Sequence, residues 1–169
     1  MKCCPDRQRS AVLRVAGWLL MFSVGLAASC SADTPSDWVE VSAGSEFSLM
    51  APAGTKFIKR EGIDSFVGEF DGPGFKLQFD YGAYSGSLED DGNAQNYAAE
   101  NLPVRGKQAR LVTSYSPHRS DDFPYFIGMH FADLGETVIG TRKLTIYAWV
   151  KSTDDYPLVR EILGTVEFN

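Results

Sequence analysis

The chain has few of the residues that most often carry catalysis or hold metals. Its 169 residues include two histidines and three cysteines, and two of the cysteines, Cys3 and Cys4, lie close to the N-terminus. A transition-metal site usually takes two or more ligands from His and Cys, and the two histidines, His118 and His130, stand in different segments. We therefore expect no metal, no cofactor and no enzymatic activity.

Positive charge is also scarce beyond the N-terminal segment. Four of the 16 Lys and Arg and one of the 22 Asp and Glu precede residue 30, which leaves 12 basic against 21 acidic residues and a formal charge of −9. Proteins bind nucleic acid largely by pairing Lys and Arg with phosphates. The sequence therefore argues against nucleic acid as a partner, and against an anionic membrane surface held by charge.

The apolar run at residues 15–28 is shorter than a transmembrane helix requires. It would span about 21 Å as a helix, whereas a hydrocarbon core of about 30 Å needs roughly 20 residues. Basic residues precede the run and small residues follow it. A basic start, an apolar middle and a small-residue exit are the three parts of a secretory signal peptide.

The exit of this run, Leu26-Ala27-Ala28-Ser29-Cys30, resembles the lipobox of bacterial lipoproteins. The resemblance implies cleavage before Cys30 and attachment of diacylglycerol to its thiol, which would otherwise be a free thiol in an oxidising compartment. Ala27 departs from the pattern, because lipoproteins usually have leucine at that position. Ordinary signal-peptidase cleavage near Ala32, with Cys30 discarded, is the alternative.

These features divide the chain into a signal peptide at 1–29, a polar tether at 30–37 and a single domain at 38–169. The expected location is the bacterial cell envelope, with the domain facing the periplasm and the outer membrane favoured over the inner. The 140 residues from Cys30 onward are enough for one domain with a sizeable core.

Apolar and polar side chains alternate along most of the domain, which predicts β-strands. The clearest case is 75–81, with four aromatic or apolar residues on one side and Lys, Gln and Asp on the other. The segment 144–150 (LTIYAWV) is apolar on both sides, which predicts a central strand. We expect the other strands at 38–41, 46–49, 56–60, 65–70, 108–115, 123–131 and 165–168.

Two helices are expected in addition. One covers residues 93–102 with Asn93 as its N-cap, and the other begins after Asp154 or Asp155 and ends at Gly164. The fold class is therefore α+β, a largely antiparallel β-sheet with one mid-chain and one C-terminal helix packed on it.

This order of elements, together with three loose motifs, resembles the Mog1/PsbP-like sandwich. The motifs are Ala51-Pro52-Ala53-Gly54, Gly62-Ile63-Asp64-Ser65 and the ending Ile162-Leu163-Gly164-Thr165-Val166-Glu167-Phe168. Members of that group are mostly small non-enzymatic binding or assembly proteins, and several are exported lipoproteins. The resemblance implies such a role here, and it carries over no site residue.

The polar loop at 116–122 could carry chemistry, because His118 lies there among serines and aspartates. An envelope hydrolase or a metal-dependent enzyme using these residues is the alternative to a binding protein. A catalytic triad, however, holds its members on separate rigid elements, so one short loop favours a solvated turn. His130 lies on the polar side of its strand, where a hydrogen-bonded structural histidine is expected.

Three aromatic residues, Tyr84, Phe126 and Trp149, are candidates for lining a groove. Strand alternation places Phe126 and Trp149 opposite the main apolar side of the sheet; helices that cover this second face are the alternative. We predict a membrane-anchored envelope lipoprotein whose domain binds a small ligand or an envelope protein. An exposed apolar patch would favour a protein partner, and an enclosed concavity would favour a small ligand.

Overall fold

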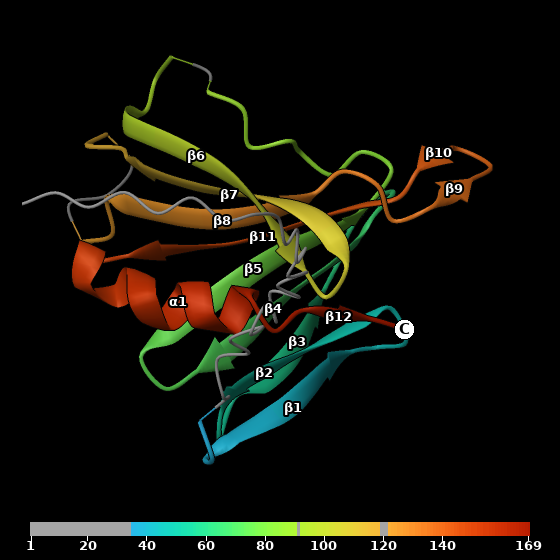
Figure 1. Cartoon of the computed structure of the whole chain (residues 1–169), viewed down its shortest axis with the longest axis horizontal. Coiled ribbons are helices and arrows are strands. Elements are labelled where there is room, and N and C mark those ends of the chain that lie inside the picture. Colours follow the sequence, from blue (N-terminus) through green and yellow to red (C-terminus); the bar gives the residue numbers. More distant parts are fainter. Residues whose placement is uncertain (1–34, 91, 119–121) are drawn as a thin grey trace, which may run out of the picture. The chain divides into compact units, whose positions relative to one another are not determined.

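A computed structural model describes residues 35–90, 92–118 and 122–169 (Figure 1). The proposed signal peptide and Cys30 lie outside these residues. The described residues fall within one compact unit. None of the helices in these ranges is long and apolar enough to cross a membrane.

The largest element is a seven-stranded antiparallel sheet with the spatial order β3-β4-β5-β11-β8-β7-β6. The middle strand, β11 (Lys143–Val150), pairs with β5 and β8, which confirms the central position predicted from its apolar sequence. The other strands are β3 (Lys56–Arg60), β4 (Phe66–Gly72), β5 (Phe75–Gly82), β6 (Gln95–Val104), β7 (Lys107–Tyr115) and β8 (Tyr125–Phe131).

One face of this sheet, which we call the inner face, packs against helix α1 (Tyr156–Leu163) and a small second sheet (Figure 1). The second sheet has the order β1-β2-β12, formed by β1 (Trp38–Ala43), β2 (Phe47–Pro52) and β12 (Glu167–Phe168). Both layers contribute side chains to one core, which includes Phe47, Leu49, Phe70, Leu77, Phe79, Met129, Leu144, Ile146, Ile162 and Leu163.

The aromatic side chain of Phe47 joins the two sheets. Its ring centroid lies 5.0 Å from that of Phe79 and 5.9 Å from that of Phe70, both edge to face. Such pairs are worth about 0.5–1.5 kcal/mol beyond the area they bury. The alternation that predicted the strand at 75–81 therefore also identified its buried side.

The C-terminal helix follows the predicted caps. Ser152 and Asp155 form a capping box around the short 3₁₀ turn η1 (Thr153–Asp155), in which Ser152 Oγ accepts from Asp154 N at 3.1 Å and Asp155 Oδ2 accepts from Ser152 N at 3.2 Å. Helix α1 then has Pro157 in its first turn and Gly164 as its C-cap. These local signals were sufficient to predict the helix.

The mid-chain helix predicted at 93–102 is wrong, because this segment is the edge strand β6. Strand β6 forms a hairpin with β7 through Arg105 and Gly106, which both have positive φ, the conformation that tight hairpin turns require. Pro103 is tolerated because an edge strand need not donate at every residue. The described part of the fold is thus mostly antiparallel β-sheet with one short C-terminal helix.

Candidate functional site

The outer face of the seven-stranded sheet, opposite the core, carries a cluster of aromatic side chains. Phe126 and Trp149 are register partners on β8 and β11 with ring centroids 5.0 Å apart, and Phe126 stacks on Tyr147 at 5.7 Å. Phe126 is buried, whereas Tyr147 and Trp149 are half-buried. The structure thus brings two of the three predicted groove residues together, and α1 packs on the opposite face.

A loop, residues 83–90, rather than a helix covers part of this outer face. Ser85 is buried, and its Oγ donates a hydrogen bond to Thr145 Oγ1 at 2.7 Å. The Thr145 hydroxyl donates in turn to the carbonyl of Gly86. Tyr97 Oη donates to the carbonyl of Leu88 at 2.8 Å. These bonds fix residues 85–88 over β11 and β8.

His130 lies beneath this loop and is buried. Its Nδ1 is 2.8 Å from Thr145 Oγ1. Burial lowers the pKa of the His130 imidazole, and the nearby positive charges of Lys143 and Arg110 lower it further, while Glu89 opposes them. The imidazole is therefore neutral near pH 7, which agrees with the expected structural role.

The two histidines do not form a joint site. His118 is exposed and follows Tyr115, which pairs with the first residue of β8, whereas His130 is near the last residue of that strand. At about 3.3 Å per residue the strand separates the two imidazoles well beyond the reach of one ligand. No group of three or more His, Cys, Asp or Glu that could hold a metal occurs within 35–90, 92–118 and 122–169.

Glu69 is the most buried carboxylate of the outer face, with its side chain 6% exposed. Its Oε1 lies 2.7 Å from Arg60 Nη2 and 3.2 Å from Lys76 Nζ. The hydrogen bond from Arg60 lowers the pKa of the Glu69 carboxyl, and Lys76 lowers it further, against the effect of burial. Glu69 is therefore ionised and engaged by two cations, which is unlike the raised pKa that a general acid needs.

Tyr84, the third predicted groove residue, lies apart from the aromatic cluster. It belongs to one of three loops at one end of the sheet. These loops are the turn at 61–65, residues 83–84, and the hairpin of β9 (Glu136–Thr137) and β10 (Gly140–Thr141). A Cβ on Gly140 would lie 3.9 Å from Ala83 Cβ, and a Cβ on Gly82 would lie 2.9 Å from Ser65 Oγ. The segment at 82–84 therefore adjoins both the turn at 61–65 and the hairpin.

Four large apolar or aromatic side chains of these loops are exposed to solvent. Ile63 and Val138 are fully exposed, and Tyr84 and Ile139 are 65% and 62% exposed. We call these four residues the apolar end. Ile63, Val138 and Ile139 were not among the site residues predicted from the sequence. They could have been found from the sequence, because turns that connect strands usually carry polar residues and these three residues are apolar.

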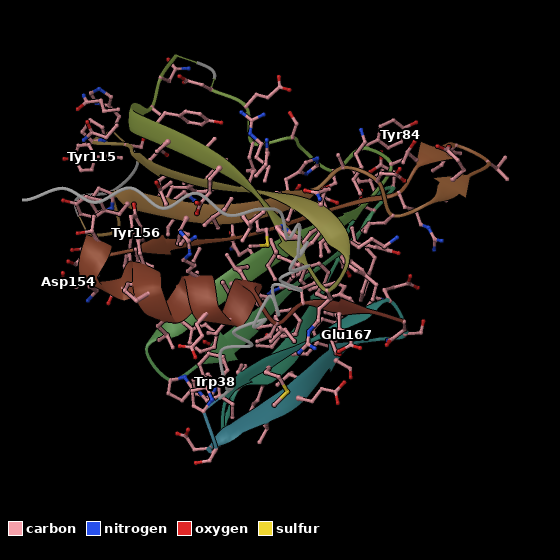
Figure 2. The ribbon with its side chains drawn as sticks, viewed as in Figure 1. Trp38, Tyr84, Tyr115, Asp154, Tyr156 and Glu167 are labelled. Carbon is pink, nitrogen blue, oxygen red and sulfur yellow. The ribbon has the colours of Figure 1, made fainter. Side chains whose placement is uncertain are left out.

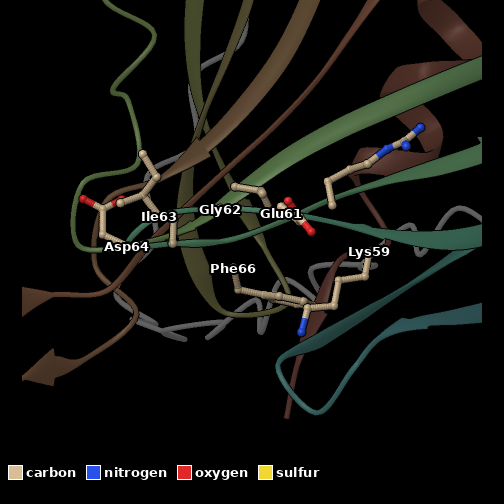
Figure 3. A pocket seen from close by; sticks show the side chains of 9 residues that line it. Lys59, Glu61, Gly62, Ile63, Asp64 and Phe66 are labelled. Carbon is tan, nitrogen blue, oxygen red and sulfur yellow. The ribbon is translucent and has the colours of Figure 1, made fainter.

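An open hollow of about 820 Å³ lies beside the apolar end and is lined by residues 59–67 (Figure 3). Ile63 and Asp64 lie on the turn, and Lys59 extends along Phe66, with Nζ 5.9 Å from the ring centroid. All nine lining residues belong to one continuous stretch. Because the described residues that line it all come from the β3–β4 connection and the strand ends beside it, the hollow resembles a surface indentation more than a catalytic site.

The apolar end lies away from the start of the domain. Trp38 pairs with Pro52, close to the beginning of β3, whereas the turn at 61–65 follows the last residue of that strand. Figure 2 shows the same relation, with Trp38 and Tyr84 toward opposite ends of the molecule.

No protein-family model matches this sequence, and no curated protein matches it either. The similarity to the Mog1/PsbP-like group therefore stays a prediction.

Proposed function

We propose that the protein is a bacterial envelope lipoprotein, anchored through lipid on Cys30, whose domain binds a partner protein through the apolar end. The observation that carries the proposal is the gathering of Ile63, Tyr84, Val138 and Ile139 on three adjoining loops. Single exposed apolar residues are ordinary. A group of them on one surface is typical of an interaction site, because burying it against a partner removes apolar area from water.

The charges around the apolar end favour a particular kind of partner. Glu61, Asp64, Asp133 and Glu136 are all exposed in the turn and in or next to the hairpin. A partner surface with an apolar recess and a basic rim would complement this end, since complementary charge favours correct encounter. The same carboxylates disfavour pairing with a second copy through this end, and disfavour an anionic lipid surface.

The position of the apolar end suits an anchored protein. A tether of eight residues, 30–37, spans at most about 28 Å. Because β1 begins on the side of the domain away from the apolar end, a short tether would leave that end free to meet a partner. The exposed apolar patch also satisfies the criterion that favoured an envelope protein over a small ligand.

Binding without catalysis agrees with the environment of the histidines. His130 is buried under the 83–90 loop with its Nδ1 engaged by Thr145. A hydrolase or metal-dependent enzyme would therefore depend on His118, and the described residues bring no second histidine near it.

The test uses the full chain expressed in bacteria, with a photo-crosslinking amino acid in place of Val138. We expect it to crosslink a specific envelope protein, and the double variant Ile63→Ser, Ile139→Ser to reduce that product by about tenfold or more, because it removes most of the remaining apolar area. Val39→Ser, an exposed apolar residue on β1, is the matched control and should leave the crosslink unchanged. The photo-crosslinking amino acid in place of Lys107, an exposed residue of β7, is a second control. The proposal would be contradicted if this position gave the same crosslinked product as position 138, or if the double variant left the amount of product unchanged.

A further inference from the structure

A second hollow, of about 440 Å³, lies where β5 begins and β11 ends. Lys76 comes from β5, Trp149 from β11, Phe123 from the segment before β8, and Lys151 and Asp155 from the connection to α1. Side chains from four separate segments thus meet here, in contrast to the single stretch that lines the hollow in Figure 3. The volume falls in the range of small-molecule sites.

The polar groups of this hollow present positive charge. Lys151 Nζ lies 5.3 Å from the centroid of the Phe123 ring, and Lys76 Nζ lies 3.2 Å from Glu69 Oε1. The one carboxylate that lines the hollow, Asp155, accepts a hydrogen bond from the Ser152 backbone in the capping box. Two lysines, one of them paired with Glu69, therefore line one small volume in a domain with only 12 basic residues against 19 acidic ones.

The apolar groups of the hollow are two aromatic rings. Trp149 is half-buried and held edge to face against Phe126, with ring centroids 5.0 Å apart. Phe123 is 41% exposed. A fixed, partly exposed ring offers a flat surface to a planar ring or to the C–H face of a sugar, and it loses little conformational entropy on binding.

We propose that this hollow binds a small ring compound that carries a carboxylate. Lys76 and Lys151 pair with the carboxylate, and Trp149 and Phe123 contact the ring. Acidic sugars and aromatic acids both have this chemistry. The site shares no residue with the apolar end, so it does not depend on the proposed protein partner.

The experiment is a nuclear magnetic resonance titration of the chain from Cys30 onward, which contains two tryptophans, Trp38 and Trp149. The probes are two pairs, glucuronate with glucose and benzoate with benzyl alcohol. We expect a carboxylate probe at millimolar concentration to shift the indole N–H resonance of Trp149, assigned with Trp149→Phe, and to leave that of Trp38 in place. The uncharged member of the same pair should bind about tenfold more weakly.

Three lysine variants test whether the positive charge of the hollow, and not only its shape, determines the affinity for the carboxylate probe. Lys76→Ala and Lys151→Ala should each lower the affinity for the carboxylate probe by about tenfold and leave the affinity for its uncharged partner unchanged. Lys76→Arg should restore much of the affinity, because it keeps the charge. Lys107→Ala, an exposed lysine on β7, is the matched control and should change nothing.

Each outcome bears on the proposal. A response to glucuronate alone identifies acidic sugars as the ligand class, and a response to benzoate alone identifies aromatic acids. The proposal is overturned if no probe shifts Trp149, if charged and uncharged partners bind equally, or if both lysine-to-alanine variants bind like the unmodified chain.

Discussion

His130 Nδ1 and Thr145 Oγ1 lie 2.8 Å apart on directly paired residues of β8 and β11, under the 83–90 loop. The Thr145 hydroxyl donates its one proton to the Gly86 carbonyl, because a carbonyl oxygen can only accept. We therefore assign the proton of the neutral imidazole to Nδ1, which donates to Thr145. This pair connects the covering loop to the middle of the sheet.

The lowered pKa of His130 predicts a loss of stability in mild acid. The unfolded chain takes up a proton at its ordinary pKa of about 6.5, whereas the buried imidazole resists protonation. The free energy of unfolding should therefore be constant above about pH 6.5 and decrease as the pH falls below that value. Urea melts between about pH 7.5 and 5 should show this decrease in the unmodified chain and a smaller one in His130→Gln.

His118→Gln is the matched control for this measurement, because His118 is exposed. It should keep the full pH dependence. A control that loses the dependence as strongly as His130→Gln would show that burial of His130 is not its cause.

Gly128 allows the 83–90 loop to lie flat on the outer face. A Cβ at this position would come within 2.8 Å of Phe126 Cζ and 3.0 Å of Leu88 Cδ1. Gly128→Ala should lower the free energy of unfolding by about 1–3 kcal/mol, because neither neighbour can move without disturbing its own packing. Gly86→Ala, where a Cβ would meet nothing within 4 Å, should change it by about 0.5 kcal/mol or less. Equal effects in urea melts would contradict this explanation of Gly128.

Two isoleucines provide a direct test of which side chains form the core. Ile146 on β11 is fully buried and Ile63 is fully exposed. Ile146→Ala should lower the free energy of unfolding by about 2–4 kcal/mol, since it leaves a cavity. Ile63→Ala should change it by about 0.5 kcal/mol or less. A large loss from Ile63→Ala would mean that this residue is packed within the chain and would remove support for the apolar end.

The lipid anchor on Cys30 can be tested separately from the domain. Cys30→Ser should abolish incorporation of labelled fatty acid and leave the protein in the soluble fraction or as an uncut precursor. Ser29→Ala, one residue before the cleavage point, is the control and should still incorporate label. An unmodified protein that takes up no label and begins at Asp33 by mass spectrometry would exclude the lipoprotein.

Local sequence patterns predicted much of the sheet and the terminal helix. Alternation with a period of two identified β5 and its buried side, because consecutive side chains of a strand point to opposite faces. The same rule predicted that Phe126 and Trp149 share the second face. The ends of α1 were readable because Asp155, Pro157 and Gly164 are local signals that lie at or next to the ends of the helix.

The tertiary structure decided the features that depend on distant partners. Residues 93–102 have a pattern that suits a helix locally, but pairing with β7 satisfies the backbone groups of 95–104 and makes them a strand. Tyr84 proved separate from Trp149, and its neighbour Ala83 adjoins Gly140 of the β9–β10 hairpin, because chain topology places these loops at one end of the sheet. The sequence alone determined which residues alternate and where the helix is capped; packing determined what is exposed, because exposure depends on every segment that folds over a residue.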